Sequence, residues 1–114
     1  DENSPVDIYM GIGGAPEGVL AAAALSCFGG QIQTRLVLDK ENEIRARNLG
    51  VKDTSKKYNI DEMIKGDVMF CATGVTSGDI VEGISISDKS FIANTFALHK
   101  DLKINKKITN THKK

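Results

Sequence analysis

The stretch that decides the fold is residues 6–20, which read VDIYMGIGGAPEGVL. The β-rich residues Val6 to Met10 predict a short strand, and the glycines that follow predict a turn. Pro16 predicts the first turn of a helix, where its missing N–H costs nothing. We expect this helix over Pro16–Phe28, ended by Gly29. Because its residues are apolar all round, we expect it to be buried on more than one face.

The remainder of the chain predicts further strands and helices around this unit. Asn59 and Glu62 have the spacing of a helix N-cap and its partner. The run Val68–Ala72 is continuously apolar, which is typical of a central strand covered on both faces. We therefore predict an α/β fold, a mixed sheet with packed helices, in one domain over residues 1–114. The other expected strands are residues 31–38, 84–86, 91–99 and 102–109, and the other expected helices are residues 41–49 and 60–65.

Composition is that of a soluble globular protein. The 114 residues are 40% hydrophobic and 26% charged, and no apolar run reaches the length of a membrane span. The N-terminus is acidic, unlike a secretory signal, and lacks an initiator Met, so we expect a fragment or processed product. Cys27 and Cys71 lie in apolar segments without metal-type spacing, which predicts buried free thiols. These features favour a cytoplasmic protein that does not contact a membrane.

Charge is distributed unevenly along the chain. Residues 1–99 carry 9 Lys/Arg and 14 Asp/Glu, whereas residues 100–114 carry 6 Lys and one Asp. A basic tail is one feature of nucleic-acid-binding proteins. The alternation of Leu102, Ile104 and Ile108 instead favours a half-buried strand whose charged face lies at a sheet edge. We therefore expect no nucleic-acid partner.

The glycine-rich turn before the helix is the first candidate site. Its glycines permit positive φ and close approach of a ligand, and the free N–H groups and dipole of a helix start favour a phosphate. Glu17 would repel that phosphate unless a cation such as Mg²⁺ or Mn²⁺ lay between them. The dinucleotide fingerprint fails at Pro16, and the P-loop fails at Val19, where a lysine is required. A purely structural tight turn is the alternative.

A second loop, Thr73–Asp79, follows the predicted central strand. If that strand were parallel to residues 6–10, both loops would lie at one sheet edge, where Thr73, Thr76 and Asp79 could contribute oxygen atoms. The alternative is a turn that caps the next segment. His99 and His112 have no partner at ligand spacing, and we expect both to be lone surface histidines. Residues 56–58 are expected to form a solvated loop.

Three stretches together carry a family resemblance. Residues 6–23, residues 45–50 (RARNLG) and residues 66–79 (GDVMFCATGVTSGD) resemble, in order, the C-terminal half of bacterial class II fructose-1,6-bisphosphatase. That family belongs to the metal-dependent, lithium-sensitive sugar and inositol phosphatases. The resemblance implies that this chain is most of the second half of a layered α/β/α/β/α fold.

The resemblance also implies a reaction and site residues. The implied reaction is hydrolysis of the 1-phosphate of fructose 1,6-bisphosphate in gluconeogenesis, and some members also hydrolyse sedoheptulose 1,7-bisphosphate. By this resemblance Glu17 matches a metal-binding glutamate, for Mn²⁺ or Mg²⁺, and Gly14 matches a glycine that contacts substrate phosphate. We assign the Thr73–Asp79 motif no chemical role and name no catalytic residue.

The family's other metal ligands and its sugar-phosphate-binding basic residues lie in an N-terminal half that these 114 residues do not include. We therefore expect the chain to be inactive by itself. Two alternatives stay open. One is a non-catalytic phosphosugar- or nucleotide-binding domain, and the other is an assembly module that uses an exposed sheet edge. A homo-oligomer is the expected state.

Overall fold

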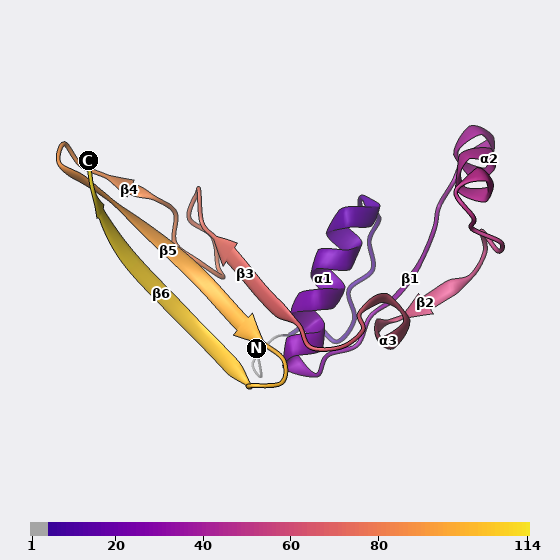
Figure 1. The fold of residues 1–114 in the computed structure, drawn as a ribbon, viewed down its shortest axis with the longest axis horizontal. Helices are drawn as coiled ribbons and strands as arrows, with labels where there is room; N and C mark the ends of the chain where they lie inside the picture. The colour runs from indigo at the N-terminus through magenta and orange to yellow at the C-terminus, as the bar shows by residue number, and fades with distance from the viewer. Residues whose placement is uncertain (1–4) are drawn as a thin grey trace.

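The computed structural model describes residues 5–114, which form helices and antiparallel sheets in an elongated arrangement (Figure 1). The molecule measures 53 × 32 × 30 Å, and its radius of gyration is 17.9 Å. A compact domain of this length would have a radius of gyration of about 13 Å. The α/β class predicted from the sequence is confirmed, and every strand pair among residues 5–114 is antiparallel.

The predicted first helix is present as α1, Ala15–Phe28. It begins with Pro16 in its first turn and ends at Gly29, whose φ of 71° lies in the left-handed region that favours glycine. The N–H of Gly30 donates to the carbonyl oxygen of Leu25 at 2.9 Å and so satisfies one of the last helical carbonyls. Pro16 and Gly29 in the sequence were therefore sufficient to predict where this helix begins and ends.

The strand predicted over residues 6–10 is wrong. These residues are assigned to no strand, and Ile8, Tyr9 and Met10 are all more than three-quarters exposed. A β-strand exists only when a neighbouring strand accepts its backbone hydrogen bonds. Neither of the sheets within residues 5–114 includes this segment. The composition favours a strand, but composition alone does not place the segment in a sheet.

A small two-stranded sheet and two helices occupy one end of the molecule (Figure 1). Strand β1, Gln33–Arg35, is shorter than the predicted residues 31–38, and its partner β2, Lys57–Asn59, lies where a loop was expected. Helix α2 covers Lys40–Asn48 and helix α3 covers Ile60–Met63. The predicted cap of α3 is confirmed, because the Asn59 side chain accepts from the Glu62 N–H at 3.0 Å.

The larger sheet contains four strands: β3, Met69–Thr73; β4, Ser85–Ile86; β5, Ser90–His99; and β6, Ile104–Lys113. β5 is central, with β3 and β4 along one side and β6 along the other (Figure 1). The prediction that residues 68–72 form a covered central strand is wrong, since β3 is an edge strand with alternating exposure. Cys71 is accordingly exposed rather than buried, while Cys27 is half-buried, and both thiols are free.

The core lies where α1 packs against one face of this sheet. The ring of Phe28 on α1 stacks on Phe96 of β5 with a centroid separation of 6.2 Å, and Leu98 on the same face is 1% exposed. Only Ala22, Ile60 and Leu98 are fully buried among the apolar residues that the structure describes. The prediction that α1 is buried on several faces is therefore wrong for this chain, because no described element covers the outer side of the helix.

β6 confirms the predicted charged strand at a sheet edge, since Lys106 and Lys107 are exposed. The predicted half-buried alternation is wrong, because Leu102 is 66% and Ile108 40% exposed, and only Ile104 of the three predicted residues is half-buried. The boundaries differ from the predicted residues 102–109, because Leu102 lies in the turn before the strand and the ladder continues to Lys113. Pairing with the ten-residue β5 sets this length.

Candidate functional site

The start of α1 leaves backbone donors available to a ligand. Gly14 precedes the helix in an extended conformation, and no side chain caps this end. The first helical hydrogen bond runs from the Gly18 N–H to the Gly14 carbonyl oxygen at 3.0 Å. The N–H groups of Ala15 and Glu17 precede that bond and have no acceptor within the helix, and Pro16 has no N–H. Two N–H groups at the positive end of the helix dipole are therefore suited to an anion.

The structure brings together the two predicted site residues, Gly14 and Glu17. The Glu17 carboxylate turns back over the Cα of Gly14, so that a Cβ at Gly14 would collide with Glu17 Oε2. Both residues are exposed to solvent. The space left by the missing side chain of Gly14 is thus the space that the carboxylate enters.

The glycines of the turn are not required by backbone strain. Among the described residues, positive φ occurs at Gly29, Gly50, Gly66 and Lys103, and at no position of the turn over residues 11–18. Gly14 has φ −66° and ψ 152°, which any residue can adopt. The positive φ that these glycines permit is therefore not used, and close approach of another group is the remaining reason for a glycine at position 14.

Glu17 is the residue of this site that the sequence predicts to bind a metal. The Glu17 carboxylate is a hard oxygen donor of the kind that Mg²⁺ and Mn²⁺ prefer. No group of three or more His, Cys, Asp or Glu side chains within residues 5–114 could hold a metal ion. A carboxylate is the right kind of ligand for Mg²⁺ or Mn²⁺, but one carboxylate is fewer than the ligands that such an ion needs. The assignment of Glu17 as a metal ligand therefore stays a prediction.

The loop after β3 is held by its own backbone. The Ile84 N–H donates to Val75 O at 3.2 Å, and a Cβ at Gly74 or Gly83 would collide with the facing backbone. The Ser77 hydroxyl accepts from the Gly83 N–H at 3.0 Å. These contacts match the turn interpretation of Thr73–Asp79. Because residues 6–10 form no strand, the parallel pair that would have brought both loops to one edge does not exist in this chain.

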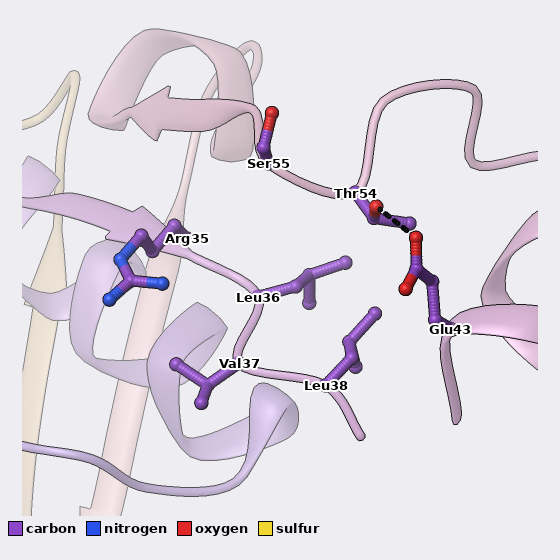
Figure 2. Close-up of a pocket in the computed structure, with 7 residues that line it drawn as sticks. All are labelled: Arg35, Leu36, Val37, Leu38, Glu43, Thr54 and Ser55. Atoms are coloured by element: carbon purple, nitrogen blue, oxygen red, sulfur yellow. Dashed lines mark hydrogen bonds between the residues drawn. The ribbon is translucent and has the colours of Figure 1, made fainter. Parts of the chain in front are cut away.

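A surface hollow of about 250 Å³ lies elsewhere, between the chain leaving β1 and helix α2 (Figure 2). Two charged residues, Arg35 and Glu43, line it. Glu43 is already engaged, since it accepts from Arg47 at 2.8 Å and from the Thr54 hydroxyl at 3.1 Å. The Arg47 guanidinium, and then the Thr54 hydroxyl, lower the pKa of the Glu43 carboxyl. Neither Gly14 nor Glu17 lines this hollow. We assign it no ligand.

Both histidines have partners that the sequence did not reveal. His99 Nδ1 lies 3.4 Å from Asp67 Oδ1, and His112 stacks on Phe91 with ring centroids 4.7 Å apart. His99, whose side chain is 15% exposed, is therefore not the surface histidine that was expected, whereas His112 does lie exposed at the surface. His99 and Asp67 are brought together by the β3–β5 ladder, which pairs Met69 with His99, and no spacing along the chain predicts their contact.

None of the helices within residues 5–114 is both long and apolar enough to cross a bilayer.

Comparison with known proteins matches nearly the whole chain to one protein family. Residues 1–112 match the family model described as bacterial fructose-1,6-bisphosphatase, glpX-encoded. Fructose-1,6-bisphosphatase 2 class 2 of Escherichia coli K12 is 36% identical over 98 residues, which cover 73% of this chain and 30% of that protein. Fructose-1,6-bisphosphatase class 2 of Haemophilus influenzae is 35% identical over 125 aligned residues, covering 96% of this chain and 37% of that protein.

A further relative carries a second activity in its name. D-fructose 1,6-bisphosphatase class 2/sedoheptulose 1,7-bisphosphatase of Trichodesmium erythraeum is 37% identical over 93 residues, covering 69% of this chain and 27% of that protein. The chain therefore spans about a third of the length of the relatives that it matches.

Proposed function

The chain belongs to the family of bacterial, glpX-encoded fructose-1,6-bisphosphatases, and from this membership we propose that it forms the C-terminal part of a metal-dependent fructose-1,6-bisphosphate 1-phosphatase. In this proposal residues 1–114 are a single C-terminal α/β domain of a longer phosphatase whose N-terminal catalytic half lies outside them. The enzyme would be a cytoplasmic homo-oligomer that acts in gluconeogenesis. Sedoheptulose 1,7-bisphosphate would be a second substrate in this proposal, since the name of one relative includes sedoheptulose 1,7-bisphosphatase.

One observation supports this assignment most directly: the Glu17 carboxylate lies against Gly14 at an uncapped helix start. Gly14 would let a substrate phosphate approach the backbone, and the N–H groups of Ala15 and Glu17 would bind its oxygen atoms. Glu17 would hold Mn²⁺ or Mg²⁺ beside the phosphate. A bound divalent cation supplies positive charge that offsets the repulsion between the two anions and polarises the phosphoryl group.

The same geometry explains why we expect no turnover by the isolated chain. One carboxylate cannot complete an octahedral oxygen shell, and the described residues gather no group of three or more His, Cys, Asp or Glu side chains that could hold the metal. The remaining ligands, and the group that activates water, would have to come from the other part of the enzyme. We therefore derive no catalytic step from residues 1–114.

A chimeric enzyme tests the role of Glu17. Residues 1–114 would replace the matching C-terminal segment of the Escherichia coli relative, and phosphate release from fructose 1,6-bisphosphate would be measured with Mn²⁺ or Mg²⁺. Glu17→Gln should lower kcat/KM by about 100-fold or more, because charge stabilisation by a metal is worth several kcal/mol. Glu41→Gln, at an exposed acid in the first turn of α2, is the matched control and should leave the rate unchanged.

Circular dichroism and thermal melting would show that each chimera is folded. A folded chimera without activity, or a Glu17→Gln variant as active as the Glu41→Gln control, would contradict the proposal.

A further inference from the structure

The turn that joins β5 to β6 is bonded to the start of β3. It comprises residues 100–103. The Lys100 N–H donates to Val68 O at 2.8 Å, and the Asp101 N–H donates to Asp67 Oδ1 at 3.4 Å. The first of these bonds joins two backbone groups, so the protonation of a side chain does not remove either of its partners. It therefore serves as a reference for the rest of the turn.

One ring nitrogen of His99 lies between a donor and an acceptor. Nδ1 accepts from the Leu102 N–H at 3.5 Å, and the same atom lies 3.4 Å from Asp67 Oδ1. A ring nitrogen with a lone pair accepts a hydrogen bond, and a ring nitrogen with a proton donates one. Nδ1 can therefore bond to the Leu102 N–H or to the Asp67 carboxylate, but not to both at once. Its proton decides between them.

In the neutral ring, the surroundings favour a lone pair on Nδ1. Asp67 Oδ1 already accepts from the Val68 N–H at 2.8 Å and from the Asp101 N–H, so it has donors without His99. For the Leu102 N–H, Nδ1 is the acceptor that the described part of the chain provides. The His99 side chain is 15% exposed, so water has limited access to this nitrogen.

The charged groups around His99 come from three segments. His99 alternates with Leu98 and so lies on the sheet face opposite α1, and its partners Met69 on β3 and Ile104 on β6 are uncharged. The charged residues that flank it are Asp67 before β3, Lys100, Asp101 and Lys103 in the turn, and Lys106 on the same face of β6. Because the Asp67 carboxylate is in contact with the ring, a protonated ring has an acceptor in place and need not leave the turn.

We propose that His99 is a pH-sensitive switch of the β5–β6 turn: the neutral ring binds the Leu102 N–H, and the protonated ring releases it and donates to Asp67. Imidazole is the side chain whose charge ordinarily changes between about pH 5 and 8. Lys103 follows Leu102 directly and has φ 53°, a conformation that residues other than glycine rarely adopt. The released segment is thus the strained end of the turn. This switch does not depend on the proposed phosphatase activity.

Exchange of the backbone amides with water tests the switch in the 114-residue chain. NMR would follow it by magnetisation transfer at pH 8 and by deuterium exchange at pH 5, with correction for the intrinsic pH dependence of exchange. Protection of the Leu102 amide should fall by about three- to tenfold from pH 8 to pH 5, as expected for the loss of one hydrogen bond. Protection of the Lys100 amide should stay constant. Unchanged protection of Leu102, or an equal fall at Lys100, overturns the proposal.

The ring and two matched variants give independent measurements. Nitrogen NMR of wild-type His99 should show Nδ1 without a proton at pH 8 and with one at pH 5. His99→Asn places an uncharged oxygen near the position of Nδ1 and should keep Leu102 protected at both pH values. His112→Asn, at the exposed far end of the β5–β6 ladder, is the control and should keep the wild-type pH dependence. A proton on Nδ1 at pH 8, or a pH dependence that is lost in His112→Asn and kept in His99→Asn, overturns the proposal.

Discussion

Replacing Gly14 by alanine tests the contact between Gly14 and Glu17 with a single methyl group. The backbone at position 14 is extended, with φ −66° and ψ 152°, so alanine fits without strain. Its Cβ would overlap Glu17 Oε2, which lies at the end of a flexible side chain and can move. We therefore expect the free energy of unfolding to change by less than about 0.5 kcal/mol.

The size of the functional effect follows from how far the carboxylate must move. Ordinary contact between a carbon and an oxygen begins at roughly 3.4 Å, and the collision at Gly14 would displace Glu17 Oε2 by about 1 Å or more. A displacement of about 1 Å at a reacting centre can cost about 100-fold in rate. In the chimera with the Escherichia coli relative, Gly14→Ala should therefore lower kcat/KM by about 100-fold.

Gly13→Ala is the control for this experiment, because an added Cβ at Gly13 meets nothing within 4 Å and its φ is not positive. It adds the same methyl group one residue earlier in the same turn. Melting temperatures of the two variants should agree with that of the parent chimera within about 2 °C. Equal activity of Gly14→Ala and Gly13→Ala would refute the assignment of Gly14 and Glu17 to one site.

Two further predictions concern the scaffold. Leu98→Ala truncates a side chain that is 1% exposed and should lower the free energy of unfolding by about 2–3 kcal/mol. This is the lower part of the usual range, because α1 can move into the vacated space. Leu102→Ala, at a 66% exposed position, should lower the free energy of unfolding by less than about 0.5 kcal/mol. Urea unfolding measures both, and equal midpoints would contradict the core described above. The Arg47 guanidinium and the Thr54 hydroxyl lower the pKa of Glu43 below its ordinary 4.5, so the stability from this carboxylate is present above that pH and is lost as the pH falls through the lowered pKa. Carboxyl NMR titration should show the pKa rising in Arg47→Gln and unchanged in Arg45→Gln.

Local signals in the sequence were reliable where neighbouring residues supply the interactions. The start of α1 at its proline, the end of α1 at Gly29 and the Asn59–Glu62 cap of α3 all depend on contacts within a few residues. The family resemblance also came from contiguous residues, and the comparison over residues 1–112 confirms it.

The tertiary structure decided everything that depends on distant partners. Residues 6–10 and residues 68–72 have strand composition, but whether a strand forms, and whether it is central or at an edge, depends on which other strands are present. The contacts of His99 with Asp67 and of Phe28 with Phe96 likewise join residues far apart in the chain.

For the candidate site, the sequence by itself named Gly14 and Glu17 and the kind of ligand that such a turn attracts. Only the structure placed the carboxylate over the glycine, and it excluded backbone strain as the reason for that glycine. The physical reason is how far apart along the chain the interacting residues lie. Helix ends and turns are stabilised by hydrogen bonds between near neighbours, whereas strand pairing, burial and the packing of side chains depend on the whole set of residues that surround them.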